Sequence, residues 1–151
     1  MCSSDLDRLV RLNIETDMVY ADAEDGEVPS DLFAGYDLLV VPSLYAEREV
    51  YLERIRDFVA AGGTCVATFK TGFADENNKV YADLQPHILR EAAGVYYQSF
   101  MIPDEEDASV FGELLVRTVG NTAEESAAEV ILTYEEPAWK DYAAAVRNPF
   151  G

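Results

Sequence analysis

Two side chains in this sequence are of types that often carry out catalysis, and both sit in segments that favour a structural role. Cys65 lies in a β-prone run, residues 64–69, directly after Gly62-Gly63. A nucleophilic cysteine of an α/β protein usually occupies a sharp strand-to-helix turn, which this run lacks. Burial in an apolar strand raises the pKa of a thiol, so we expect Cys65 to be buried and unreactive. His87 is the only histidine, which excludes a pair of histidine metal ligands, and we expect it to lie exposed on a short helix.

The sequence also disfavours a serine nucleophile and a phosphate site. The sequence contains no G-x-S-x-G motif, the turn that carries the nucleophile of α/β hydrolases. Residues 68–72 (TFKTG) close a predicted parallel strand, where open α/β sheets bind ligands, and could hold a phosphate as in flavin-binding folds. Such loops normally lead into a helix N-terminus, whereas residues 73–78 (FADENN) are acidic and turn-like. The sequence therefore disfavours a phosphate site.

Acidic and aromatic side chains could serve a sugar-cleaving site. The pairs Asp75-Glu76 and Glu135-Glu136 supply carboxylates, but a glycosidase needs two of them about 5 to 9 Å apart across a cleft. Neighbouring acids are expected by chance in a chain with 29 of them. Trp139, with Tyr134 and Tyr142, could stack on a sugar, although covering an edge strand or a subunit contact is the commoner use of such a patch. We expect no catalytic, cofactor-binding or metal-binding residue in this chain.

Residues 36–72 form the structural unit that the sequence defines best. Residues 37–42 are a short apolar run without polar alternation, which is typical of a strand covered on both faces. Residues 46–61 place apolar side chains at helical spacing, so we expect a helix that packs on the sheet and buries Ile55. Together with the strand over 64–69 they make a crossover unit, and its two strands must be parallel because such connections are nearly always right-handed.

The other predicted elements are shorter. We expect a helix over residues 4–12, a strand over 15–20, a loop over 21–29, a helical turn over 30–33, a turn at 77–78 and a helix over 85–93 that ends at Gly94. The remainder is mostly β, with strands over 95–102, 114–119, 130–134 and 143–147, and with turns or loops over 104–107 and 120–126. These elements predict an α/β fold with a doubly wound, mostly parallel sheet of the flavodoxin type, in a single domain over residues 1–151.

Composition excludes several classes of protein. The net charge is −18, and no run of Lys or Arg could bind nucleic acid or an anionic membrane, so we expect neither partner. Two cysteines make no disulfide framework, which favours a reducing compartment such as the cytoplasm. The N-terminus has no apolar core of a signal peptide, and no stretch of 18 apolar residues occurs, so we expect no membrane span.

The sequence resembles the trimerisation domain of glycoside hydrolase family 42 β-galactosidases. A helix followed by Gly-Gly-Thr and a strand is common in α/β folds, but its combination with T-x-x-T-G and D-E-N is more specific. Thr71 stands where the family has serine, residues 82–85 replace a glycine-rich segment, and Ala144 stands where glycine is usual. The segments that carry the resemblance span nearly the whole chain: 36–38 (YDL), 41–45 (VPSLY), 58–64 (FVAAGGT), 68–72 (TFKTG), 75–77 (DEN), 133–134 (TY) and 147–151 (RNPFG).

The resemblance implies a fold related to class I glutamine amidotransferases, without the elbow cysteine that those enzymes carry. It implies that the catalytic glutamates lie on a separate TIM barrel, absent from these 151 residues, and that this chain is a non-catalytic assembly domain. Its partners would be that barrel and identical subunits, in a homotrimer. It also implies truncation at both ends, because the family's domain starts with a strand before the first helix and continues past the closing Phe-Gly.

An alternative function remains open at this point. The chain could be a free-standing amidotransferase-like hydrolase or a flavin-binding module. An elbow nucleophile, or a phosphate loop that runs into a helix, would favour that alternative.

Overall fold

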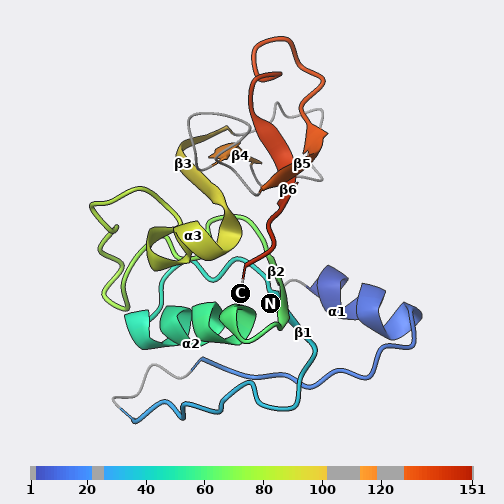
Figure 1. Cartoon of the computed structure of the whole chain (residues 1–151), viewed down its shortest axis with the longest axis vertical. Coiled ribbons are helices and arrows are strands. Elements are labelled where there is room, and N and C mark those ends of the chain that lie inside the picture. The colour runs from blue at the N-terminus through green and yellow to red at the C-terminus, as the bar shows by residue number, and fades with distance from the viewer. Residues whose placement is uncertain (1–2, 22–25, 102–112, 119–127, 151) are drawn as a thin grey trace.

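A parallel strand pair bridged by a helix is the part of the structure that the sequence defined best, and the computed structural model contains it as expected. Strand β1 (Leu38–Val41) pairs in parallel with β2 (Thr64–Ala67), with Leu38 opposite Thr64 and Val41 opposite Ala67. Helix α2 (Glu49–Ala60) connects them and lies along one side of the pair (Figure 1). The predicted crossover unit is therefore confirmed. The structure describes residues 3–21, 26–101, 113–118 and 128–150.

The core lies between α2, β1 and the helical segment that follows residue 86. Leu52 is completely buried and Ile55 is only 4% exposed, and the two side chains lie three positions apart on one face of α2. They pack with Val41 of β1 and with Leu89. The predicted burial of Ile55 is thus confirmed. Partly buried side chains that surround this cluster are Phe33, Leu39, Leu44, Cys65, Tyr81 and Ile88.

Two glycines end α2 and turn the chain into β2. Gly62 has a φ of 97°, in the left-handed region that favours glycine, and its N–H donates to the carbonyl of Val59. A side chain at Gly63 would overlap the ring of Phe58. This close approach lets Phe58 of α2 lie over the turn.

A second helical segment leads into the second sheet. It consists of a short 3₁₀ helix, η1 (His87–Leu89), and α3 (Arg90–Ala93), and it ends at Gly94, whose φ is 67°. This agrees with the predicted helix over 85–93. The chain returns to the same place at its C-terminal end, where Asn148 Nδ2 donates to the carbonyls of Glu91 and Ala92, both at 3.0 Å.

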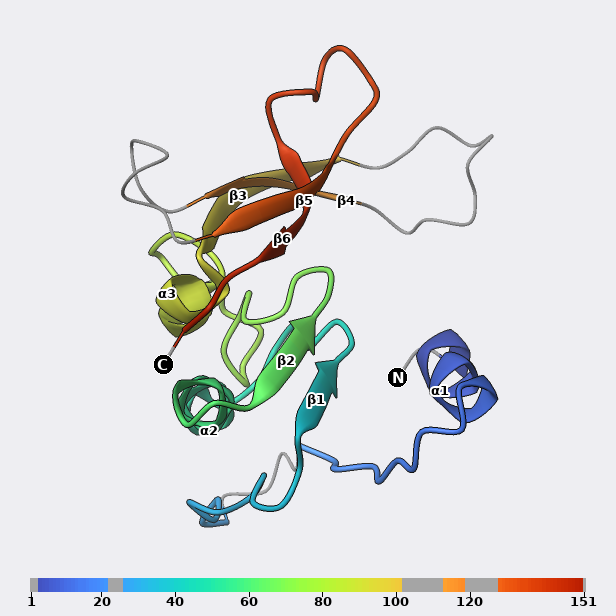
Figure 2. The same cartoon turned by 45° about the vertical axis from the view of Figure 1, so that its right-hand side comes forward.

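The second sheet is antiparallel and has the strand order β3-β4-β6-β5. Its strands are β3 (Val95–Met101), β4 (Glu113–Thr118), β5 (Glu129–Thr133) and β6 (Ala143–Arg147), close to the predicted ranges. It lies above the parallel pair in Figure 2. The predicted loops over 104–107 and 120–126 lie outside the described residues.

The predicted mostly parallel sheet is limited, in the described part of the chain, to the β1–β2 pair. The strands described after Gly94 pair antiparallel instead, β3 with β4, β4 with β6 and β5 with β6. The pair is also less covered than the apolar run predicted, because Leu38 is 40% exposed and Val66 is 48% exposed. No helix among the described residues is long and apolar enough to cross a membrane.

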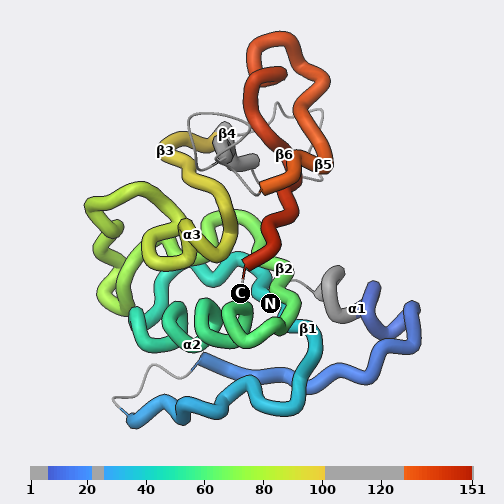
Figure 3. Tube along the Cα trace, viewed as in Figure 1, coloured from blue at the N-terminus to red at the C-terminus, as the bar shows by residue number. Residues whose placement is uncertain are grey.

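The predicted strand over 15–20 is wrong for this structure. Helix α1 (Ser3–Arg11) is present as expected, but residues 12–21 leave it as an irregular, exposed segment (Figure 3). A strand exists only where its backbone pairs with another strand, and nothing in the described residues pairs with this one. The local pattern was therefore not sufficient to decide its structure.

Candidate functional site

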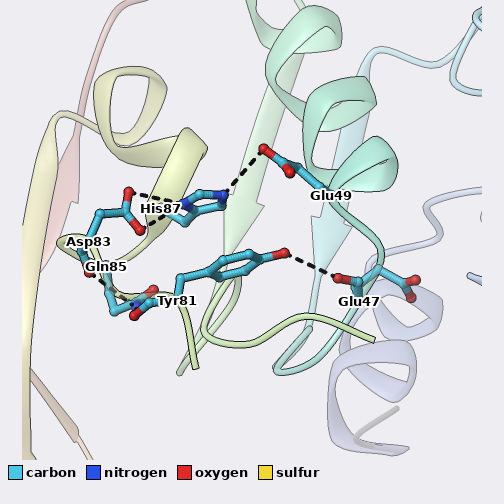
Figure 4. A network of polar contacts seen from close by, with 6 residues as sticks. All are labelled: Glu47, Glu49, Tyr81, Asp83, Gln85 and His87. Atoms are coloured by element: carbon cyan, nitrogen blue, oxygen red, sulfur yellow. Dashed lines mark hydrogen bonds and ion pairs between the residues drawn. The ribbon is translucent and has the colours of Figure 1, made fainter. Parts of the chain in front are cut away.

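A cluster of polar side chains surrounds His87, at the start of η1 (Figure 4). The two carboxylate oxygens of Asp83 lie 2.8 and 2.9 Å from its Nδ1. Its Nε2 lies 3.4 Å from Oε1 of Glu49, the first residue of α2. The imidazole also stacks on Tyr81, with ring centroids 3.7 Å apart and planes 9° from parallel.

The prediction that His87 is exposed is wrong, because its side chain is only 16% exposed. Its φ of 55° is in the left-handed region, which a residue other than glycine seldom adopts. That backbone conformation turns the ring towards Tyr81 and α2. The i, i+4 spacing of Asp83 and His87 was a signal in the sequence, but the contribution of Glu49 comes from a residue 38 positions earlier.

Hydrogen bonds and burial hold the rest of this cluster. Burial, with the nearby charge of Glu49 as the next cause, raises the pKa of Tyr81 to about 12, so its hydroxyl stays protonated at neutral pH. That hydroxyl donates to the carbonyl of Glu47 at 3.5 Å. Gln85 Nε2 donates to the carbonyls of Tyr81 at 3.1 Å and Asp83 at 3.4 Å. The Gln85 bonds hold the segment from 81 to 87 together, and the bond from Tyr81 to Glu47 joins it to the residues just before α2.

A carboxylate and a histidine are also two of the three members of a hydrolytic triad. The group next to Nε2 therefore decides whether this pair could be catalytic. A nucleophilic hydroxyl or thiol would have to lie within about 2.6 to 3.2 Å of that nitrogen. Glu49 lies on that side of the ring instead, and its carboxylate offers no hydroxyl or thiol for the ring to deprotonate. The arrangement suits a structural network of polar contacts.

Cys65 lies in β2 and packs against the core cluster. Burial raises the pKa of its thiol to about 11. Because the thiolate is the nucleophilic form, this side chain is almost entirely unreactive thiol at neutral pH. Cys65 lies in a strand as expected but is only partly buried. Its low reactivity stays a prediction, which the raised pKa supports.

In the loop at the end of β2, residues 68–72, the threonine hydroxyls form hydrogen bonds with other groups of the protein. Thr71 is buried, and its hydroxyl donates to the carbonyl of Thr68 at 2.9 Å. The hydroxyl of Thr68 accepts from the backbone N–H of Ser43 at 3.0 Å. After the loop, Asp75 accepts hydrogen bonds at 2.9 Å from the backbone N–H groups of Asn77 and Lys79, which makes a turn and not a helix N-terminus.

Lys70, in the same loop, lies among aromatic rings that the sequence analysis did not bring together. Its Nζ is 3.6 Å from the centroid of the Phe100 ring, which belongs to β3. The rings of Phe69, Phe73 and Tyr45 follow at 5.2, 5.3 and 5.7 Å. These distances are those of cation–π attraction, so Lys70 links the parallel pair to the antiparallel sheet. Phe69 and Phe73 were visible beside Lys70 in sequence, whereas Phe100 is 30 residues away.

The remaining candidates lie in separate places. Asp75-Glu76 belongs to the turn after β2, whereas Glu135-Glu136 is exposed in the connection between β5 and β6. Trp139 lies in that connection too, with its ring 6.3 Å from that of Tyr142. Among the described residues, no three acidic, histidine or cysteine side chains gather as metal ligands would.

The known proteins that this chain resembles in sequence are β-galactosidases. The family model described as the β-galactosidase trimerisation domain matches residues 6–151. β-Galactosidase BglY of Alicyclobacillus acidocaldarius is 38% identical over 105 residues, which cover 70% of this chain and 13% of that protein. β-Galactosidase BgaB of a Geobacillus species is 30% identical over 127 residues, covering 82% of this chain and 19% of that protein.

A solved structure agrees with the sequence relatives. The crystal structure of the β-galactosidase from Bacillus circulans sp. alkalophilus superimposes with a TM-score of 0.77 at 25% identity, and the match covers 96% of this chain and 22% of that one. The chain thus spans about a fifth or less of the length of these relatives. Because the family model matches nearly all of its residues, the chain belongs to the family of β-galactosidase trimerisation domains.

Proposed function

We propose that this chain is the assembly domain of a longer β-galactosidase, which it joins to identical subunits in a homotrimer. Hydrolysis of terminal β-galactosides would then take place on a TIM barrel elsewhere in the same polypeptide. The observation that carries this proposal is the match of the trimerisation-domain family to residues 6–151. The small share of each relative that the chain covers supports a catalytic part outside it.

The side chains support a domain without chemistry of its own. Glu49 occupies the side of His87 where a hydrolase would need a nucleophile, and the thiol of Cys65 has a raised pKa. We therefore propose that the chain has no catalytic, cofactor-binding or metal-binding residues. The alternative of a free-standing amidotransferase-like hydrolase or a flavin-binding module would require a reactive thiol or a phosphate loop before a helix. Neither the surroundings of Cys65 nor the turn at Asp75 favours it.

The complete domain, in this proposal, is a single doubly wound unit of the amidotransferase type that includes all 151 residues. The parallel β1–β2 pair with α2 across it supports this assignment, because it is the repeating unit of such folds. A cytoplasmic location is part of the same proposal. The free thiol of Cys65 supports it, since thiols persist in reducing compartments.

Two measurements test the proposal. Light scattering coupled to size-exclusion chromatography should give three times the subunit mass for the parent protein. Hydrolysis of a nitrophenyl β-galactoside should require the parent and be lost when a catalytic carboxylate outside these residues is replaced. A monomeric parent would refute the assembly role, and turnover by the purified chain would refute the absence of chemistry.

A further inference from the structure

Strand β5 has the composition of a buried strand but lies exposed at the edge of the antiparallel sheet. Three consecutive aliphatic residues fill its middle, and Val130 is 43%, Ile131 55% and Leu132 60% exposed. In the described part of the chain β5 pairs with β6 alone, so no strand lies on its other side. Exposed edge strands usually carry charged residues or proline, which prevent association. These three residues include neither, and an uncovered run of this kind promotes association.

The connection from β5 to β6 extends the same surface. Figure 1 shows it at one end of the longest axis of the molecule, beyond the sheet. It contains Trp139, whose ring lies 6.3 Å from that of Tyr142. Tryptophan and tyrosine are enriched among the residues that dominate the binding energy of protein interfaces. Strand β5 and this connection, residues 129–142, are called the β5 surface below.

The register of β5 favours a contact through side chains over the addition of a further strand. Two shifts interrupt its pairing with β6, one between Val130 and Leu132 and one between Leu132 and Thr133. Irregularities of this kind bend a strand and turn its edge away from a potential partner strand. Packing of the exposed aliphatic side chains is therefore the main contact that this surface can offer.

We propose that the β5 surface packs against a neighbouring copy of the same parent protein. This inference rests on the proposed function, in which the 151 residues belong to a longer subunit that forms a trimer. Subunits around a three-fold axis meet through two different surfaces, so the contact is heterologous. The β5 surface of one subunit thus meets a different surface of the next one, and not a second β5.

The course of the chain favours a neighbouring subunit over the rest of the same polypeptide. The segment after β6 turns back to α3, where Asn148 donates to the carbonyls of Glu91 and Ala92. Helix α1 lies beside β1, away from the β5–β6 connection (Figures 1 and 2). In the proposed function the remainder of the parent continues from these two places, and neither is next to the far end of the β5 surface.

Charge defines the chemistry of the surface that the neighbour presents. The β5–β6 connection is acidic, because Glu135, Glu136 and Asp141 are exposed beside a single basic residue, Lys140. Like charges that face one another across an interface repel, whereas opposite charges speed association and fix the register. The surface on the neighbour should therefore have an apolar centre with arginine or lysine at its rim.

Charge insertion in the intact parent protein tests the contact. Val130→Glu places a carboxylate in the β5 surface, and Val80→Glu is the matched control because Val80, in the segment after β2, is 46% exposed. Val130→Glu should raise the dissociation constant of the trimer by about 10-fold or more, whereas Val80→Glu should leave it unchanged. Light scattering over a dilution series measures both constants. Equal constants for the two variants would overturn the proposal.

Hydrogen exchange of the wild-type parent needs no substitution, so it decides the question even if a glutamate variant does not fold. Peptides within residues 129–142 should exchange about 10-fold more slowly in the trimer than after dilution to monomers. Peptides over residues 64–67 of β2 should exchange equally in both states. Slow exchange of 129–142 in the monomer would mean that the same polypeptide covers β5, and fast exchange in the trimer would mean that nothing does. Either result overturns the proposal.

The mass of the wild-type parent separates this inference from the proposed function. A trimer that withstands Val130→Glu as well as Val80→Glu refutes this inference and leaves the proposed function intact. A wild-type parent that is monomeric at all concentrations refutes the trimer, and this inference with it.

Discussion

Replacing Ile55 by alanine should destabilise the core between α2 and β1. Ile55 is 4% exposed and packs with Val41, Leu52 and Leu89. The substitution removes three carbon atoms, and at about 0.8 kcal/mol for each buried methylene the lost transfer free energy is about 2.4 kcal/mol. The cavity left behind adds to this, within the usual range of about 2 to 5 kcal/mol for such changes. We expect a loss of about 3 kcal/mol in the free energy of unfolding.

Thermal unfolding followed by circular dichroism measures this loss. For a domain of this length, about 1 kcal/mol lowers the melting temperature by about 2 to 4 °C, so Ile55→Ala should lower it by about 6 to 12 °C. Ile131→Ala is a matched control, because it deletes the same atoms from a side chain that is 55% exposed. Ile55→Asp should be worse than Ile55→Ala, since it buries an unpaired charge.

Equal melting temperatures for Ile55→Ala and Ile131→Ala would show that the contact of Ile55 between α2 and β1 does not stabilise the fold. An unchanged melting temperature for Ile55→Asp would show that Ile55 is not buried at all. The measurements need protein concentrations at which light scattering detects no aggregate.

The other predictions concern chemistry and association. The purified chain should hydrolyse no nitrophenyl β-galactoside, and a turnover that one carboxylate substitution abolishes would contradict this. In a Cys2→Ser background, Cys65 should react at pH 8 about 100-fold more slowly with a thiol reagent than in urea, because a thiol pKa of about 11 instead of 9.0 leaves about 100-fold less thiolate; equal rates would be evidence against its burial. The folded state keeps a proton on Cys65 that the unfolded state loses between about pH 9 and 11, so stability should fall as the pH rises through that window, and Cys65→Ala should remove that part of the slope. The isolated chain should self-associate irregularly in light scattering, since the screening length at physiological salt is about 8 Å and contact between exposed apolar side chains outweighs the screened repulsion between chains of charge −18; a well-behaved monomer would count against it. Lys70→Met should lower the melting temperature more than Lys140→Met, because Lys70 alone of these two lies over the ring of Phe100.

The local sequence pattern predicted the elements whose contacts come mostly from residues close to them in the sequence. The β1–α2–β2 unit followed from apolar runs and helical spacing within residues 36–72, and the last four strands were found close to their observed bounds. These strands and helices bury their apolar side chains against elements that are close in the sequence, or against more than one neighbouring element. Their type therefore depends little on which distant segment completes the packing.

Tertiary contacts decided the features whose partners are far apart in the sequence. Residues 15–20 have the pattern of a strand, but a strand also needs a neighbour, and the described residues provide none. His87 is enclosed because Glu49 of α2 reaches its Nε2, and the position of Lys70 depends on Phe100 of β3. The sequence by itself thus determined the family and the central crossover unit. Only the fold determined which polar groups meet and that residues 15–20 have no strand partner among the described residues, because those properties belong to pairs of distant segments and to no single stretch.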